Sequence, residues 1–271
     1  MKNKKQLSDV TVVSYFFIFT EGTLILDVFF KIKIAEVVFA VSANFIETQN
    51  YFSDFITSEP EEVVITLPIE EIGAFNEKMP DFTLEMCERA VLKYKVDCSL
   101  VSFGAFPFHA SALSYKGKGY IFTALSGVGK STHSRLWKEQ FGDSVVIIND
   151  DRPYLKVTSS GVIVCSHPQS GKHGIYTNTT CKLNAICKIV RDESNHIKKV
   201  PKASFFPFMV QQSFTLDTPE LTAKIIKLIK DVLNKVIVYE IHCNISDSTA
   251  LEICNSLQNH ESVYNCEETN D

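Results

Sequence analysis

The pattern of apolar and polar positions divides this chain of 271 residues into two parts. Up to about residue 80, β-branched and aromatic residues gather in short runs, a pattern that predicts strands. The runs are Thr11–Phe19, Thr23–Phe30, Val37–Ser42 and Glu62–Leu67. Over Asp81–Tyr94 the apolar residues recur at helical spacing, so we predict a helix there. Residues 1–100 are therefore expected to form a β-rich N-terminal region.

In the second part, residues 101–271, predicted strands and helices alternate. Two short apolar strands, Pro107–Ser114 and Lys118–Thr123, flank a predicted hairpin turn. A glycine-containing loop, a helix over Lys130–Gln140 and a buried strand over Ser144–Ile148 follow, which is the order of a βαβ unit with a right-handed crossover. Further strands are predicted at Tyr154–Thr158, Gly161–Ser166, Leu183–Val190 and Val236–Cys243, and helices at Pro219–Leu233 and Ser246–Leu257. We therefore predict an α/β fold in which a mixed sheet has the glycine loop at its centre.

The composition excludes some classes of function. Apolar residues make up 45% of the chain and charged residues 22%, which is ordinary globular usage. A formal net charge of -5 argues against a protein that binds nucleic acid by neutralising phosphates. The apolar stretch Val10–Phe30 is interrupted by Glu21 and Asp27, so we expect neither a signal peptide nor a membrane span. These observations lead us to expect a cytoplasmic protein.

The eight cysteines do not show the spacing of a zinc site, because no two of them are separated by two residues. Several lie inside apolar runs, for example Cys165, Cys187 and Cys243. We therefore expect reduced thiols that act as small buried apolar residues.

The clearest chemical signal is the segment Ala124–Ser131, which matches a phosphate-binding loop with alanine in place of the first glycine. Gly127 and Gly129 let the backbone bring its N–H groups close to phosphate oxygens, and the helix that follows directs its positive end at the same anion. Lys130 would reach the β- and γ-phosphates of ATP, and the Ser131 hydroxyl would bind Mg²⁺. A chance match in a surface turn is the alternative, but a predicted strand precedes the segment and a predicted helix follows it. The residues expected to contact the nucleotide are Ser126, Gly127, Val128, Gly129, Lys130, Ser131 and Thr132.

A second signal follows one helix later, where the apolar run Val145–Ile148 ends in Asn149, Asp150 and Asp151. Phosphate-loop enzymes bind Mg²⁺ at this position, so both carboxylates are candidate ligands together with Ser131. Two adjacent acids also permit a division of labour, in which one binds the metal and the other accepts a proton from the attacking hydroxyl. The alternative is that one of the two only caps the turn that follows.

Taken together, these residues resemble the HPr kinase/phosphorylase family. The segments that carry the resemblance are Ser126–Ser131, Asn149–Asp151 and Phe108–Leu113, with further likeness at Ser170–His173 and Val238–Asn244. It runs from about residue 85 to about residue 257. The resemblance implies a phosphate-loop core of the kind that HPr kinase shares with ATP-dependent phosphoenolpyruvate carboxykinase.

The resemblance also implies roles for single residues. Asp150 would be the catalytic base and Asp151 a metal ligand. His109 would lie near the phosphates, and Lys172 would steady the transferring phosphoryl group. From the residues alone, His109 is equally well explained as a hydrogen-bonded structural histidine, and Lys172 as part of a solvated turn.

The function expected from these signals is that of an ATP- and Mg²⁺-dependent kinase that transfers the γ-phosphoryl group to a hydroxyl. The acceptor is left open between a protein, a peptide and a small molecule, and residues 1–100 are a candidate region for its recognition. The alternatives are a nucleotide-binding regulatory module without turnover, and an ATPase or phosphorylase. The family resemblance implies a homo-oligomer, with a monomer as the alternative, and no nucleic acid or membrane partner is expected.

Overall fold

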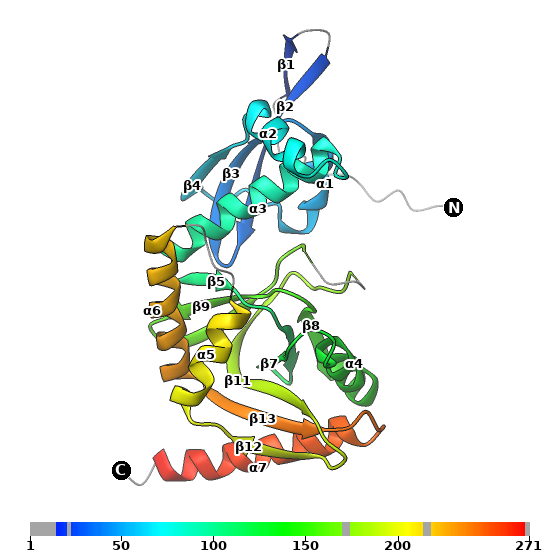
Figure 1. Cartoon of the computed structure of the whole chain (residues 1–271), viewed down its shortest axis with the longest axis vertical. Coiled ribbons are helices and arrows are strands. Elements are labelled where there is room, and N and C mark those ends of the chain that lie inside the picture. The colour runs from blue at the N-terminus through cyan, green and yellow to red at the C-terminus, as the bar shows by residue number, and fades with distance from the viewer. Residues whose placement is uncertain (1–14, 21–22, 170–173, 214–217, 269–271) are drawn as a thin grey trace, which may run out of the picture. The chain divides into compact units, whose positions relative to one another are not determined.

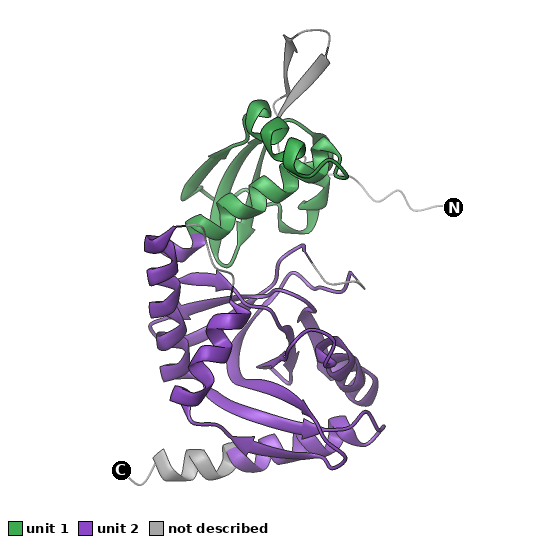
Figure 2. Cartoon of the chain, viewed as in Figure 1, with its two compact units in different colours: residues 1–99 green, residues 100–271 purple. Residues whose placement is uncertain are grey.

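The computed structural model describes residues 15–20, 23–169, 174–213 and 218–268, and the side chains described lie between residues 28 and 260. The chain divides into two compact units, residues 1–99 and residues 100–271, which Figure 2 colours separately. Both units combine helices with a sheet, and the second unit contains a mixed sheet. The predicted α/β class is therefore confirmed.

The N-terminal unit contains a four-stranded sheet in the order β1-β2-β3-β4 (Figure 1). Its strands are β1 (Tyr15–Thr20), β2 (Thr23–Ile34), β3 (Val37–Ala43) and β4 (Val63–Thr66). The first three strands are antiparallel, and β4 joins β3 in parallel. Each of the four apolar runs thus overlaps one strand of this sheet, although residues 11–14 of the first run lie outside the described residues.

Helices make up a larger share of this unit than the sequence indicated. They are α1 (Ile46–Tyr51), a short 3₁₀ turn at Ser53–Phe55, α2 (Ile69–Lys78) and α3 (Leu84–Ser102). The predicted helix over Asp81–Tyr94 is therefore α3, which begins later and extends further. The prediction missed α1 and α2.

Glu88 connects α3 to the start of α1. Its buried carboxylate accepts hydrogen bonds from the backbone N–H and the side-chain amide of Asn44, at 2.6 and 2.7 Å, and from the Thr48 hydroxyl at 2.5 Å. The N–H of Phe45, the N-cap residue of α1, also points to it, at 3.3 Å. A carboxylate at a helix N-terminus satisfies N–H groups that have no partner within the helix. Glu88 therefore takes the part of a capping side chain for α1.

The C-terminal unit contains a nine-stranded sheet in the order β5-β9-β10-β11-β7-β6-β8, with β13 paired to β11 and β12 paired to β13. The strands are β5 (Ala105–Pro107), β6 (Ser111–Tyr115), β7 (Lys118–Thr123), β8 (Val145–Asn149), β9 (Tyr154–Thr158), β10 (Gly161–Cys165), β11 (Thr180–Arg191), β12 (His196–Lys199) and β13 (Ile237–Cys243). Strand β11 is parallel to both β7 and β13. The loop that follows β7 therefore leaves the interior of the sheet, as predicted.

The prediction of one strand over Pro107–Ser114 was wrong. The segment is divided between β5 and β6, and the three residues between them form hydrogen bonds outside the ladder. The N–H of Phe108 donates to Pro153, that of His109 to Gln212 and that of Ala110 to Asp151. Because these N–H groups bond to loops and to a helix end, the chain bends where the apolar pattern alone predicted a continuous strand.

Four helices pack on this sheet: α4 (Lys130–Phe141), α5 (Lys202–Gln212), α6 (Pro219–Lys235) and α7 (Thr249–Glu268). Helices α4 and α7 cover one face, where Trp137 of α4 is fully buried. Its ring lies 5.6 Å from that of Tyr115 and 5.5 Å from those of Tyr120 and Phe122. Helix α5 lies over the other face (Figure 1), where Lys188 of β11 approaches the Phe208 ring. Among the described residues, no helix is both long and apolar enough to cross a membrane.

The cysteines agree with the prediction where the structure describes them. None of the seven described cysteines forms a disulfide, and five of them are buried. The five are Cys87, Cys165, Cys187, Cys243 and Cys254.

Candidate functional site

The loop between β7 and α4 has a backbone that requires glycine at two positions. The φ angle is 77° at Gly127 and 128° at Gly129, values that residues with a Cβ rarely adopt. Among the described residues, no heavy atom lies within 4 Å of where a Cβ would stand at Gly127, so conformation and not crowding calls for glycine there. Gly129 occupies the N-cap position of α4 and has no side chain with which to cap it. An external anion can therefore serve as the cap of this helix.

Lys130, the first residue of α4, is buried at the mouth of this loop. Its ammonium group donates a 3.3 Å hydrogen bond back to the carbonyl of Ala124. Burial lowers the pKa of Lys130, and the nearby Asp151 carboxylate acts in the opposite direction. The side chain thus holds a positive charge in a poorly solvated position, an arrangement that favours the binding of an anion.

The next residue joins the loop to the acid pair. The Ser131 hydroxyl donates a 3.3 Å hydrogen bond to the backbone carbonyl of Asp150, just past the end of β8. Asp150 is buried, whereas the side chain of Asp151 is 29% exposed. The structure therefore brings together two segments that lie one helix apart in the sequence.

Asn149 shapes the turn that carries the two acids. Its side-chain oxygen accepts hydrogen bonds from the N–H groups of Asp151, at 3.0 Å, and Arg152, at 2.7 Å. Its amide donates to the carbonyls of His167 and Gln169, both at 2.9 Å. An asparagine that bonds to its own chain two and three residues ahead forms a tight local turn. The last residue of β8 thus sets the direction in which the chain presents Asp150 and Asp151.

His109 lies close to Asp151, in the bend between β5 and β6. Its Nδ1 is 3.0 Å from the Gln212 side-chain oxygen, and its Nε2 is 3.8 Å from a carboxylate oxygen of Asp151. Burial is the main reason that the pKa of His109 is lowered, and the Lys130 charge lowers it further. The imidazole is therefore neutral at pH 7. Because it faces both Asp151 and Lys130, it belongs to the same group of side chains.

A cavity of about 510 Å³ lies beside the glycine loop and is lined by Gly127, Val128 and Gly129. It opens at the carboxyl ends of β7, β11 and β13, which run parallel to one another. Sheets of this kind bind ligands at that edge. Its apolar and uncharged walls include Val128, Thr132, Leu136, Ile189, Cys243 and Ile245.

The inner wall of this cavity is electrically neutral. His133 is fully buried, and its Nε2 accepts a 3.1 Å hydrogen bond from the indole N–H of Trp137. Burial lowers the pKa of His133 to about 4 and raises that of Cys243 to about 11. Neither group is charged at pH 7, so this wall suits an uncharged, apolar part of a ligand.

Arg191, the last residue of β11, braces the loop from the cavity side. Its Nη2 donates to the carbonyl of Gly127 at 2.6 Å, and its Nε to that of Val128 at 3.2 Å. These carbonyls are thereby turned toward Arg191. In a loop whose N–H groups receive an anion, carbonyls that point away reduce repulsion.

The predicted site residues fall into three groups. The structure brings together Lys130, Ser131, Asp150, Asp151 and His109. Gly127, Val128, Gly129 and Thr132 line the adjoining cavity, whereas Ser126 does not. Lys172 lies outside the described residues.

Sequence reasoning missed two residues of this site. Gln212 reaches His109 from the end of α5, a helix that was not predicted, and Arg191 reaches the loop from the end of β11. Neither residue belongs to a local motif. Arg191 ends a long strand that runs parallel to β7. Its contact with the loop after β7 could have been predicted only if the order of the strands had been known.

Comparisons with known proteins yield a distant likeness to solved structures. No known protein family matches this chain, and no curated protein matches it. Among solved structures, the Hpr(Ser) kinase/phosphatase from Coxiella burnetii aligns with 14% sequence identity over 59% of this chain and 98% of that chain, with a TM-score of 0.36. A likeness at this level carries no argument about function, so the candidate site rests on the geometry given above.

Proposed function

We propose that this protein is an ATP- and Mg²⁺-dependent kinase that transfers the γ-phosphoryl group of ATP to a hydroxyl. The observation that carries the proposal is the hydrogen bond from Ser131 to the carbonyl of Asp150, beside Lys130 and Asp151. It joins a glycine loop at a helix N-terminus to a pair of carboxylates. These are the parts that phosphoryl transfer requires, because its catalysis depends on positioning and on compensation of negative charge.

The phosphates of ATP would bind at the loop. The N–H groups at the start of α4 and the ammonium group of Lys130 supply positive charge there. On binding, Lys130 would exchange its 3.3 Å hydrogen bond to a neutral carbonyl for charge-assisted bonds to phosphate oxygens. The nucleoside would extend into the 510 Å³ cavity, whose neutral inner wall at His133 and Cys243 suits an aromatic base.

The residues at the end of β8 fit a magnesium ion. The Ser131 hydroxyl and the carboxylates of Asp150 and Asp151 are hard oxygen donors, the kind that Mg²⁺ prefers. When bound, the ion would compensate the charge of the β- and γ-phosphates. We propose Asp151, the more exposed acid, as the principal metal ligand among the two, and Asp150 as the base that accepts the proton of the acceptor hydroxyl.

His109 and Gln212 would position this centre. A neutral imidazole held at 3.0 Å by Gln212 can donate to or accept from a phosphate oxygen or Asp151 without adding charge. Lys172 is proposed, as from the sequence, to steady the phosphoryl group in transfer. The N-terminal unit is proposed to recognise the acceptor, and its deletion should abolish transfer while ATP binding persists.

Calorimetry with Mg²⁺ and ATP tests the proposal. The parent protein should bind ATP, Lys130→Ala should not, and Asp150→Asn should still bind but lose transfer. Arg135→Ala is the matched control, since it removes a positive charge from the same helix at a position where the side chain is 61% exposed. A parent protein that binds no nucleotide would refute the phosphate-loop interpretation.

The burial of Asp150 favours a second candidate, a nucleotide-binding regulatory module without turnover, because an acceptor hydroxyl must reach a base. The two are separated by measuring phosphate release and transfer to candidate acceptors. Binding of ATP without any release or transfer favours the regulatory module. Release without an acceptor indicates an ATPase, and phosphate-dependent reversal indicates a phosphorylase.

A further inference from the structure

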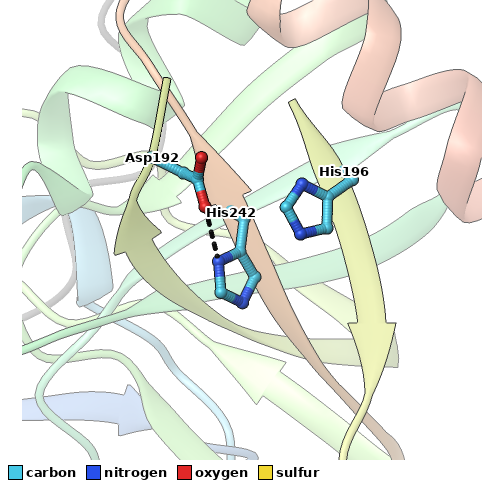
Figure 3. A group of neighbouring side chains, drawn as sticks. All are labelled: Asp192, His196 and His242. Carbon is cyan, nitrogen blue, oxygen red and sulfur yellow. Dashed lines mark hydrogen bonds and ion pairs between the residues drawn. The ribbon is translucent and has the colours of Figure 1, made fainter. Parts of the chain in front are cut away.

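A second group of titratable side chains lies apart from the acid pair, where β11, β12 and β13 meet. Asp192 follows the last residue of β11, His196 is the first residue of β12, and His242 lies near the end of β13. Each offers one ligand atom, and these three atoms all lie within 4.8 Å of one another. Figure 3 shows the Asp192 carboxylate directed at His242, with the His196 imidazole beside it on the neighbouring strand.

The sheet fixes the backbone positions of all three residues. His196 stands directly opposite His242 in the antiparallel pairing of β12 with β13. Asp192 is joined to the end of β13 by its own N–H, which donates a 3.1 Å hydrogen bond to the carbonyl of Cys243. The three side chains therefore converge without a rearrangement of the main chain, and a ligand that binds there pays little for ordering the backbone.

Neighbouring residues contact the atoms of Asp192 and His242 that do not face each other. One oxygen of Asp192 accepts from the Ser194 N–H at 3.2 Å and from its hydroxyl at 3.3 Å, which leaves the other oxygen facing His242 Nδ1 at 3.2 Å. The second nitrogen of His242 lies 3.7 Å from a Glu240 carboxylate oxygen. Glu240 is itself held by Lys188 at 2.8 Å. A carboxylate behind the second nitrogen of a histidine is the usual outer partner of a metal ligand.

We propose that Asp192, His196 and His242 form a binding site for a divalent transition-metal ion of the zinc class. Two imidazole nitrogens and one carboxylate oxygen are the ligands that such ions select, whereas Mg²⁺ and Ca²⁺ prefer oxygen alone. This donor set is chemically distinct from the oxygen donors at the end of β8. The site therefore binds a different ion from the one proposed to accompany ATP.

Binding requires one local adjustment. The two imidazole rings are stacked, with centroids 4.5 Å apart and planes 12° from parallel, so their lone pairs do not yet meet at one point. Rotation of the more exposed ring, His196, about its terminal torsion directs a nitrogen at the ion, and such torsions have broad minima. Three protein ligands leave a fourth position open to water or a ligand. Asp192 also lines the 510 Å³ cavity, so the proposed site adjoins this cavity.

The test is a titration of the full chain with Zn²⁺ in the absence of nucleotide, followed by calorimetry and by the imidazole signals in NMR spectra. We expect one saturable Zn²⁺ per chain, with shifts of the His196 and His242 ring signals that an excess of Mg²⁺ does not reverse. Co²⁺ should give the spectrum of a nitrogen and oxygen site without a thiolate charge-transfer band. Since no ATP is present, failure here is distinguishable from failure of the proposed kinase function.

Variants identify the ligands. His196→Gln/His242→Gln should weaken Zn²⁺ binding at least 100-fold, and Glu240→Gln by about 10- to 100-fold through loss of the outer contact. His260→Gln is the matched control, an exposed histidine on α7 whose loss should leave the affinity unchanged. Absence of saturable Zn²⁺ binding by the parent, or equal affinity in the double variant, would overturn the proposal. If the double variant does not fold, the ring shifts of the parent and the single variant His196→Gln decide the question.

Discussion

The buried side chain of Lys130 carries a positive charge, but its ammonium group donates a hydrogen bond to a neutral group, the carbonyl of Ala124, at 3.3 Å. Replacing it by methionine keeps the unbranched stem that packs in the loop mouth and removes only the charge. We predict that Lys130→Met will affect stability and ATP binding in opposite directions. The free energy of unfolding should stay the same or rise, whereas the affinity for ATP should fall.

The structure supports a magnitude for each effect. Burial lowers the pKa of Lys130 below 10.5, so the folded state disfavours its charged form at pH 7. Loss of that charge removes the free-energy cost of burying it, which raises the free energy of unfolding. Loss of one hydrogen bond offsets about 0.5–1.5 kcal/mol of this increase. We therefore expect a change in unfolding free energy between zero and about +1 kcal/mol. Loss of a charge-assisted bond to phosphate costs about 1.5–3 kcal/mol, which is about a 10- to 150-fold weaker affinity.

The pH dependence provides an independent check. Between the lowered folded-state pKa of Lys130 and its ordinary value of 10.5, the unfolded chain binds more protons than the folded one. The parent protein should therefore gain stability as the pH rises through that window, relative to Lys130→Met. Urea denaturation at neutral and at alkaline pH measures this, and calorimetry measures ATP binding. A variant that loses more than about 1 kcal/mol at pH 7, or that binds ATP as tightly as the parent, would refute the reasoning.

Three further predictions concern stability. His133 is fully buried, and burial lowers its pKa from 6.5 to about 4. About 3 kcal/mol of the free energy of unfolding should therefore be lost as the pH falls from 6.5 to 4. Denaturation of His133→Gln should show a flatter dependence of stability on pH across that range. Glu88→Gln keeps the shape of the buried carboxylate but replaces one acceptor by a donor, so chemical denaturation should show a loss of about 1–3 kcal/mol, and an unchanged midpoint would contradict its capping role. A Cβ at Gly119 would stand 2.8 Å from the carbonyl oxygen of Lys182, whereas among the described residues nothing lies within 4 Å of one at Gly73. Thermal unfolding should therefore show Gly119→Ala destabilised by about 1–3 kcal/mol and Gly73→Ala, in a helix, neutral or stabilised by up to about 1 kcal/mol.

Short sequence patterns predicted the elements whose conformation depends on residues close to one another along the chain. The hairpin between β6 and β7 has positive φ at Lys116 and Gly117, the conformation that a two-residue turn between such strands needs. The sequence also predicted the glycine loop with α4, and the apolar run that forms β8. Each of these segments has a short residue pattern together with residues that mark where the element begins or ends. The order of these elements therefore followed from the sequence.

Other features depend on partners that are distant along the chain. The break between β5 and β6 arises because the N–H of His109 bonds to Gln212, about a hundred residues later, which no apolar pattern encodes. Helix α5 was missed since it has a proline inside and few polar residues at helical spacing. Helices α1 and α2 of the N-terminal unit were missed because their apolar residues are few, and because α1 depends on hydrogen bonds to Glu88, which is distant along the chain.

The sequence by itself thus determined the α/β class, the glycine loop and the carboxylates available to it, since each depends on a short run of residues with a defined conformational preference. Tertiary structure decided which of these groups meet. It brought Ser131 to the end of β8, and it brought Asp192, His196 and His242 to one corner of the sheet. The physical reason is that strand order and register are set by the burial of whole faces and by backbone hydrogen bonds between distant segments, and these act on the chain only when it is folded.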